Sequence, residues 1–371
     1  MTATSEPETR SVENPVRHSY SALSADEERR AMRVHAESIV IDGCQSPTLD
    51  DLFFDDLRNG GITAISATAS ALNAQTLLVG HNDRTAREGA LALQRIRDWV
   101  SAHPNVASIA VTTEDIRRAK ADKKSAIILA FQHDGFIEDQ LELFRVFYTL
   151  GLRVFQMTYN HRGPLGDGCL EPANGGLSLF GREAVKELNR LGILIDLSHT
   201  GDRTVMETIE LSSKPVVFSH ANPRSRSNTE RGKTDEAIRA LAARGGVIGI
   251  TFWCPITAVK YEVQPGVDDV IDHIEYAVDL VGIDHVGFGS DWNLKNTRDR
   301  AERMRQAEIF LDKYPPMRRY GKVGRDPIGL EYNPEAPNLT RGLVGRGYKD
   351  DDIKKILGGN FIRVMREAWG S

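Results

Sequence analysis

The stretch that decides the fold is residues 181–199, which read GREAVKELNRLGILIDLSH. Residues 180–190 have the apolar spacing of a helix, and residues 193–197 form a short run that is apolar on both faces. A strand without an alternating polar face is typical of a parallel sheet that is buried on both sides. The unit ends in Ser198 and His199, so polar side chains follow the strand directly.

The same helix and strand pairing recurs along the chain. Residues 268–281, for example, also have helical spacing. Eight such units with no repeated nucleotide-binding glycine pattern favour a closed barrel over an open sheet. The sequence therefore predicts an α/β fold, a single (β/α)8 TIM barrel. The eight expected strands are residues 38–41, 62–67, 126–131, 152–157, 193–197, 215–218, 247–251 and 285–289.

Segments outside these units complete the expected domain organisation. Residues 1–34 are expected to form an N-terminal arm or short helix before the barrel, which takes residues 35–371. Within the barrel domain, residues 312–341 are rich in Pro, Gly, Arg and Asn with little periodicity, which predicts a lid. An amphipathic helix over residues 351–369 is expected to close the chain.

Composition limits the classes of function. A net charge of -5, with no cluster of Lys and Arg among aromatic residues, argues against nucleic acid and anionic membranes as partners. Neither a signal peptide nor a membrane anchor is expected, so we expect a cytoplasmic protein with a small-molecule substrate. Cys44, Cys169 and Cys254 have unrelated spacings, so we expect reduced thiols.

Three polar residues at strand ends indicate a metal site. In such barrels the chemistry collects at the C-terminal ends of the strands. His199 follows the fifth expected strand, His220 the sixth and Asp291 the eighth. One histidine after a strand is usually structural, but two at the same point of consecutive units, with a carboxylate, are typical of metal binding. We therefore predict a divalent metal held mainly by His199 and His220.

Other strand-end residues have weaker indications. His133 and His161 lie one or two positions away from the expected ligand line, which favours a supporting or solvent-facing position. Cys44 is the one cysteine at an expected strand end. Most cysteines are small buried side chains, so two interpretations of Cys44 stay open: a packed residue, or a metal ligand or functional thiol.

The chain resembles the membrane dipeptidase family, a family of zinc peptidases related to the amidohydrolases. The resemblance spans nearly everything from residue 39 to 369. It implies a metal-dependent hydrolase barrel that acts on dipeptides, and it implies a homodimer. The most specific stretches are residues 181–199, PVVFSH at 215–220, GFGSD at 287–291 and ILGGNFIRV at 356–364.

The resemblance breaks at four positions. Family members bind two zinc ions, through a His-x-Asp after the first strand, a bridging Glu after the third, and one His after each of the fifth and sixth. Here Cys44 and Ser46 take the His-x-Asp positions, Gln132 takes the bridging position, and Tyr159 replaces a substrate-polarising His. Two divalent ions in one site need carboxylate ligands to offset their charge, and Ser46 and Gln132 carry no such charge. We therefore expect one zinc ion per chain, with Gln132 as a third, weaker ligand beside the two histidines.

The remaining roles follow from the resemblance. Asp291 matches the eighth-strand carboxylate and would pass the proton of the attacking water to the leaving amine. Arg231 looks like the family arginine that binds the substrate carboxylate. Tyr159 would donate a hydrogen bond to the oxyanion, and Asn160 and Cys44 would line the substrate pocket.

The sequence thus predicts a metal-dependent hydrolase of dipeptides, or of similar amides such as N-acyl amino acids, that carry a free carboxylate. Two alternatives stay open. The same barrel would instead catalyse other chemistry: hydrolysis of a non-peptide amide or ester, a decarboxylation, or metal-independent catalysis by the Cys44 thiol. Or it would be a catalytically inactive barrel that binds a small molecule or a partner protein; the presence of both histidines and Asp291 argues against this.

Overall fold

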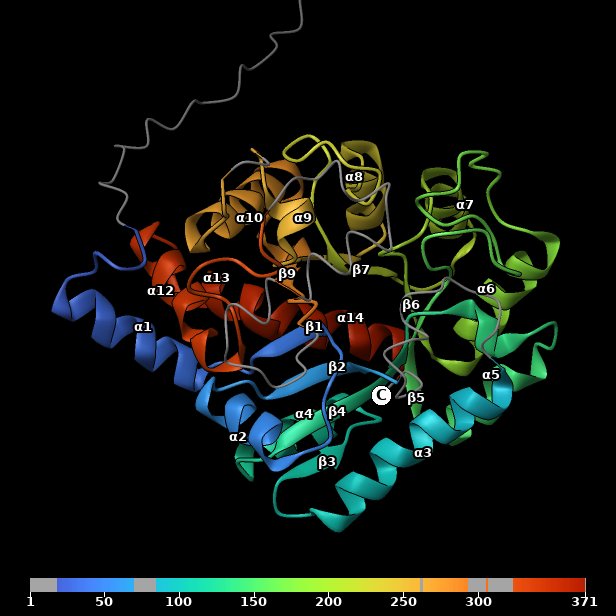
Figure 1. The fold of residues 1–371 in the computed structure, drawn as a ribbon, viewed down its shortest axis with the longest axis horizontal. Helices are drawn as coiled ribbons and strands as arrows, with labels where there is room; N and C mark the ends of the chain where they lie inside the picture. The colour runs from blue at the N-terminus through green and yellow to red at the C-terminus, as the bar shows by residue number, and fades with distance from the viewer. Residues whose placement is uncertain (1–18, 70–84, 261–262, 293–304, 306–322, 371) are drawn as a thin grey trace, which may run out of the picture.

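Eight parallel strands form the centre of the molecule, and helices surround them (Figure 1). The computed structural model describes residues 19–69, 85–260, 263–292, 305 and 323–370. The bridge between Gln45 and Trp292, and the hydrogen bond from the Asp291 N–H to the Cys44 carbonyl oxygen (2.9 Å), join the first strand to the segment after the last. The predicted barrel is confirmed. In spatial order its strands are β1 (Ile41–Gln45), β2 (Ala64–Thr68), β4 (Ser125–Phe131), β5 (Leu152–Gln156), β6 (Leu194–Asp196), β7 (Val217–Ala221), β8 (Val247–Ile250) and β9 (Val286–Phe288).

The strands differ most from the expected ones at β1, at β7 and at one additional short strand. β7 is Val217–Ala221 rather than residues 215–218, so Ser219 and His220 lie within it and not after it. β1 begins at Ile41 rather than at residue 38, because helix α1 (Ala25–Glu37) reaches this point and the Ser38 N–H caps it by donating to the Val34 carbonyl oxygen. Cys44 therefore lies within β1 and not after it. A short strand that the sequence did not predict, β3 (Ala107–Ile109), pairs with the first half of β4. Three residues carry too little periodicity to be recognised.

Helices of the outer layer alternate with the strands. α6 shows why they form where they do: the Ser178 hydroxyl accepts a hydrogen bond from the Gly181 N–H (2.8 Å) at its start, and Gly192 ends it with a left-handed φ of 78°. Its buried face includes Ala184, Val185 and Leu188. These helices are α2 (Asp51–Asn59), α3 (Ala86–Ala102), α4 (Thr113–Ala121), α5 (Glu142–Thr149), α6 (Leu179–Leu191), α7 (Asp202–Leu211), α8 (Asp235–Ala243), α9 (Cys254–Thr257) and α10 (Val267–Val281).

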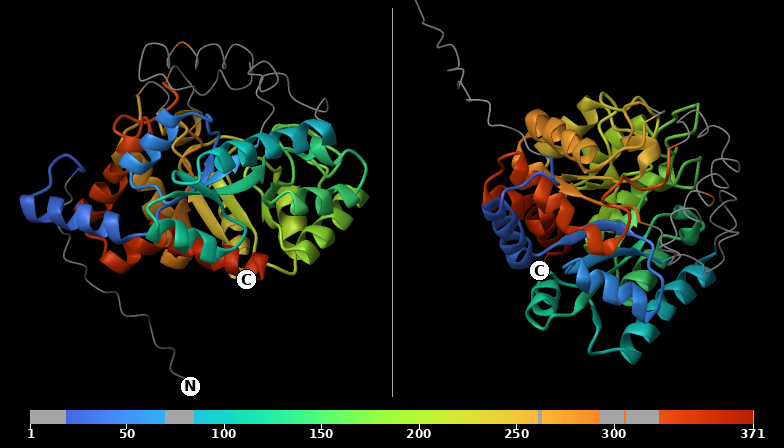
Figure 2. Two further views of the ribbon diagram at one scale, coloured as in Figure 1. Left: turned by 90° about the horizontal axis from the view of Figure 1, so that it is seen from below. Right: turned by 60° about the vertical axis from the view of Figure 1, so that its left-hand side comes forward.

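The described ends of the chain pack together outside the barrel. α1 lies beside the C-terminal helices in both views of Figure 2. Arg341 of α12 (Pro337–Gly345) pairs with Glu28 of α1 (2.7 Å), and Arg30 pairs with Asp350 (2.7 Å). The expected terminal helix is present as α13 (Asp350–Lys354), a π-helical turn (Lys355–Gly359) and α14 (Asn360–Trp369). The helix is interrupted at Gly358, whose backbone is not helical (φ 171°). Glycine is needed there because a Cβ would meet the Ile39 carbonyl oxygen.

Part of the expected lid packs against the strand ends. Residues 312–322 lie outside the described residues, whereas residues 323–341 contact the barrel. The Trp292 indole N–H donates to the Leu330 carbonyl oxygen (3.0 Å), and Asn333 accepts a hydrogen bond from the Gln45 amide (2.8 Å). The segment thus borders the end of the barrel where β1 and β9 finish. Whether residues 312–341 cover the site stays a prediction.

The barrel interior beneath the site is packed backbone against backbone. Three glycines from neighbouring strands or their ends, Gly43, Gly249 and Gly289, surround the Ser219 carbonyl oxygen. A Cβ at any of them would clash with that oxygen. Only glycine lets the backbone come this close. The position of Ser219 therefore depends on three other strands, and with it the position of His220.

Candidate functional site

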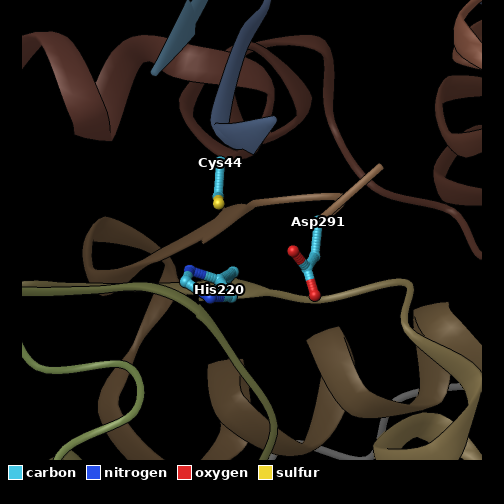
Figure 3. Close-up of side chains that lie close together, drawn as sticks. All are labelled: Cys44, His220 and Asp291. Atoms are coloured by element: carbon cyan, nitrogen blue, oxygen red, sulfur yellow. The ribbon is translucent and has the colours of Figure 1, made fainter. Parts of the chain in front are cut away.

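Four side chains from separate strands meet at the C-terminal ends of the barrel strands. Cys44 belongs to β1, His220 to β7, and His199 and Asp291 follow β6 and β9. The two imidazole Nε2 atoms are 3.0 Å apart. Ligand atoms of Cys44, His220 and Asp291 all lie within 4.8 Å of one another, and Figure 3 shows these three side chains pointing toward a common space. The structure thus brings together both predicted metal-binding histidines and the predicted base.

Hydrogen bonds fix which nitrogen of each imidazole carries the proton. The Asn160 Oδ1 atom accepts from His199 Nδ1 (2.7 Å). The Ser219 hydroxyl donates to Asp196 (2.5 Å), so its oxygen accepts from His220 Nδ1 (2.7 Å). Both Nε2 atoms therefore present lone pairs to each other, an arrangement that repels unless a cation lies between them. Nitrogens bound to one tetrahedral zinc ion stand about 3.3 Å apart, so the pair fits a metal.

Both imidazoles are neutral at physiological pH. Burial lowers the pKa of His199 and of His220 well below the ordinary 6.5, and the nearby Arg231 charge lowers both further. Only 7% of His199 and none of His220 is exposed. A neutral imidazole is the form that binds a metal.

Two buried carboxylates beneath the site were not predicted from the sequence. Asp196 accepts hydrogen bonds from the backbone N–H groups of Ser198 (3.0 Å) and Ser219 (2.9 Å), which precede the two histidines. Asp42 in β1 accepts in the same way from the N–H groups of Cys44 (3.1 Å) and Ser290 (2.8 Å). Each carboxylate ties two strand ends together. In the sequence, Asp196 was a charged residue inside an otherwise apolar run, and Asp42 was the first residue after another such run.

Asp291 has an unusual backbone. Its φ is 59°, in the left-handed region that is uncommon for residues other than glycine. A strained backbone conformation persists only where the surrounding structure enforces it, and such residues are often found at functional sites. Burial raises the pKa of Asp291 above its ordinary value, while the positive charges of Arg325 and Arg231 oppose the rise. Arg325, which the sequence did not single out, also donates to the Asp291 carbonyl oxygen.

Cys44 and Gln132 contact each other. The Gln132 amide nitrogen donates to the Cys44 sulfur (2.7 Å) and to the Thr68 hydroxyl oxygen (2.7 Å). Cys44 is 3% exposed. Burial raises the pKa of its thiol well above 9, and the carboxylates of Asp291, Asp196 and Asp42 raise it further. Without a cation nearby, these surroundings oppose a thiolate.

The sequence profile of the family described as "Membrane dipeptidase (Peptidase family M19)" matches residues 28–302 and 319–369. The chain belongs to the membrane dipeptidase family. The resemblance found in the sequence is confirmed, and residues 28–302 hold Cys44, both histidines and Asp291.

Two curated relatives show how far the likeness extends. The chain is 32% identical over 250 residues to an uncharacterized dipeptidase of Schizosaccharomyces pombe, which covers 66% of this chain and 53% of that protein. It is 27% identical over 293 residues to Dipeptidase 3 of Rattus norvegicus, which covers 77% of this chain and 53% of that protein. The chain thus spans about half the length of the curated relatives it matches.

Solved structures share the fold. An amidohydrolase from Pseudomonas aeruginosa has a TM-score of 0.78 at 33% identity, covering 92% of this chain and 99% of that one. A metallo peptidase from Rhodobacter sphaeroides, solved with a phosphinate mimic of the dipeptide L-Ala-D-Ala, has a TM-score of 0.72 at 18% identity. The second match covers 90% of this chain and 100% of that one, and shows the fold alone.

Tyr159 and Asn160 contact His199 in this member of the membrane dipeptidase family. The half-buried Tyr159 ring stacks on the His199 imidazole with ring centroids 4.2 Å apart, and it also stacks on His133 at 5.7 Å. Asn160 is 5% exposed and accepts the His199 Nδ1 hydrogen bond; whether it also binds substrate stays a prediction. His161 is exposed. Tyr159 thus lies at the site, and Asn160 lies behind the imidazole.

Arg231 lies beneath the two histidines. It is 2% exposed, and its guanidinium donates to the Ser198 carbonyl oxygen and to the His220 carbonyl oxygen (2.9 Å). These contacts hold together the ends of β6 and β7. Its Nε atom has no hydrogen-bond partner among the described residues. Whether Arg231 also binds the substrate carboxylate stays a prediction.

A cleft of about 560 Å³ lies on the outer helical layer between α10 and the end of α12, and none of the site residues lines it. In the part of the chain that the structure describes, no helix has the length and apolar content to cross a membrane.

Proposed function

We propose that this protein is a metal-dependent hydrolase of dipeptides, or of similar small amides with a free carboxylate, that works with one metal ion. The observation that carries the proposal is the pair of Nε2 lone pairs of His199 and His220, 3.0 Å apart. Zinc suits this site because it readily takes two imidazoles. Membership of the membrane dipeptidase family supports the reaction class.

The residues around the metal position have separate tasks. When bound, the ion would polarise the scissile carbonyl and lower the pKa of a water molecule. Asp291 accepts a proton from that water and returns it to the leaving amine. Tyr159 donates its phenol hydrogen to the oxygen of the carbonyl under attack. Its ring contact with His199 supports this role.

Cations at the site support a substrate with a free carboxylate. The two Nη atoms of the buried Arg231 donate to backbone carbonyl oxygens. Its Nε hydrogen is unused among the described residues, and this hydrogen and the positive charge can attract a substrate carboxylate. Arg325 is 19% exposed in its side chain and adjoins Asp291. A planar guanidinium matches a carboxylate in shape and charge. We expect dipeptides and N-acyl amino acids to be hydrolysed, and their C-terminal amides to have a much higher KM.

The decisive experiment combines metal analysis with turnover. Protein purified without chelator is analysed for metal per chain and assayed with dipeptides, N-acyl amino acids and their amidated counterparts. We expect about one zinc per chain, activity that a chelator removes and zinc restores, and loss of both in the His199→Ala/His220→Ala double variant. Absence of bound metal in the parent would contradict the proposal.

The same experiment separates the other candidates. A Cys44 thiol enzyme would keep its activity in the presence of chelator, although the buried thiol with its raised pKa is a poor nucleophile. A binding protein would hold metal without any turnover. From the family likeness we also propose a homodimer, which light scattering tests. Separately, we propose a cytoplasmic location, which cell fractionation tests.

A further inference from the structure

Cys44 occupies a position for which the proposed hydrolysis gives no task. Its side chain is 3% exposed, enters from β1 on the side opposite β6, and points with His220 and Asp291 into the same space (Figure 3). We propose that Cys44 binds the metal through its thiolate, as the third protein ligand beside His199 and His220. The inference rests on the metal binding of the proposed function and is independent of the substrate.

The geometry admits one ion among these groups. Ligand atoms of Cys44, His220 and Asp291 lie within 4.8 Å of one another. A point among three atoms at most that far apart lies within about 2.8 Å of each, against metal–ligand bonds of about 2.0 to 2.3 Å. Small side-chain rotations therefore suffice to bring the Cys44 sulfur and the His220 imidazole to one ion, with the Asp291 carboxylate beside it. His199 is already adjacent, 3.0 Å from His220.

Charge favours a thiolate at this position. The two imidazoles are neutral, and Ser46 and Gln132 stand where the family likeness leads us to expect carboxylates. Asp291 supplies one negative charge, which leaves a divalent ion half compensated in a buried site. A Cys44 thiolate supplies the second. Cys44 is well suited because a metal-bound thiol gives up its proton on binding.

Hydrogen-bond donors surround the sulfur. The Gln132 amide nitrogen donates to it (2.7 Å), and the Thr68 hydroxyl lies 3.9 Å away. The Thr68 oxygen accepts from the same amide (2.7 Å), so its own hydrogen is left to point at the sulfur. Donors aimed at sulfur stabilise its anion. Because its amide nitrogen faces the sulfur, Gln132 supports the thiolate, and in this proposal Cys44 takes the ligand position that the sequence assigned to Gln132.

Cobalt binding provides a test that does not depend on activity. Chelator-treated full-length protein is titrated with Co²⁺ alone, and the near-ultraviolet charge-transfer band of a thiolate–cobalt bond is recorded. We expect the band in the parent and in Cys254→Ser, a matched control because Cys254 is also buried but lies in a separate cluster with Ala258 and Val323. We expect Cys44→Ser to lose the band, and Cys44→His to bind Co²⁺ without it.

A second measurement covers variants that fail to fold. X-ray absorption of the zinc-loaded parent should show one sulfur neighbour at about 2.3 Å. Metal bound to the parent without the cobalt band or the sulfur neighbour overturns the thiolate ligand and leaves the metallohydrolase proposal standing. A parent that binds neither Co²⁺ nor Zn²⁺ overturns both. The two failures are therefore distinguishable.

Discussion

At the scale of single residues, the site depends on which atoms donate and which accept. Asp291 is proposed to act only while its carboxylate can take a proton. Asn at this position keeps the shape but cannot accept the proton, so we expect Asp291→Asn to lower kcat by roughly 10²- to 10⁴-fold. Steady-state kinetics with the best dipeptide, together with metal analysis, check this. Metal content should persist because Asp291 is not among the proposed metal ligands, and an unchanged kcat would exclude Asp291 as the base.

Asn160 shows how a residue behind a ligand controls it. Its Oδ1 atom holds the His199 Nδ1 proton, which keeps the Nε2 lone pair facing His220. We expect Asn160→Leu to weaken zinc affinity by about 10- to 100-fold, measured by competition with a zinc chelator. Asn160→Asp is the matched control, since a carboxylate still accepts from His199 and should retain the affinity. Equal affinities in the Leu and Asp variants would refute this role.

At the scale of secondary-structure elements, Arg231 joins two strand ends. It donates to the carbonyl oxygens of Ser198 and His220, next to the two metal-binding positions. Arg231→Met would leave each buried carbonyl without its donor, at about 1 to 3 kcal/mol apiece. We expect a lower free energy of unfolding in urea, with partial recovery in Arg231→Lys, whose single ammonium reaches fewer acceptors. If Met and Lys variants are as stable as the parent, the connection is unimportant.

Helix α10 contains a histidine that makes stability depend on pH. Burial lowers the pKa of His273 from 6.5 to about 4; its Nε2 donates to the Thr257 carbonyl oxygen (2.9 Å). The unfolded chain therefore binds the proton first, and stability is lost as pH falls from about 6.5 to about 4. The full contribution is about 3 kcal/mol. We expect His273→Gln to lack this acid loss when unfolding free energies of both proteins are compared across that range; parallel curves would disprove it.

At the scale of the whole molecule, barrel closure sets the position of the site. Gly43, Gly249 and Gly289 surround the Ser219 carbonyl oxygen, one residue before His220. Gly249→Ala forces a Cβ onto that oxygen, so β7 and β8 must separate. We expect a loss of about 1 to 3 kcal/mol in stability and weaker zinc binding.

Gly266→Ala serves as the control for that variant. Its φ is -126°, and the nearest atom to an added Cβ is the Ile328 carbonyl oxygen at 3.6 Å, an ordinary contact. Thermal unfolding and a zinc titration of both alanine variants provide the comparison. Tight zinc binding in Gly249→Ala would show that the site does not depend on close packing of these strands.

Local patterns in the sequence determined most of the fold. Apolar runs of the correct length, alternating with helical spacing, predicted eight parallel strands and a closed barrel, and the histidines at the ends of β6 and β7 were placed correctly. Such patterns succeed because burial of a helix face or a strand is a property of neighbouring residues. β3 and the start of β1 were missed, since a three-residue strand and a helix end leave too little pattern to read.

The sequence by itself determined the order of helices and strands, and hence the barrel and the two histidines at its mouth. Only the tertiary structure decided that Cys44, His220 and Asp291 share one space, that Asp42 and Asp196 fix the strand ends, and that Gln132 presents its amide nitrogen to sulfur. The physical reason is one of scale. Burial patterns are local along the chain, whereas distances between side chains of β1, β7 and β9 depend on strand register and on how the closed barrel packs.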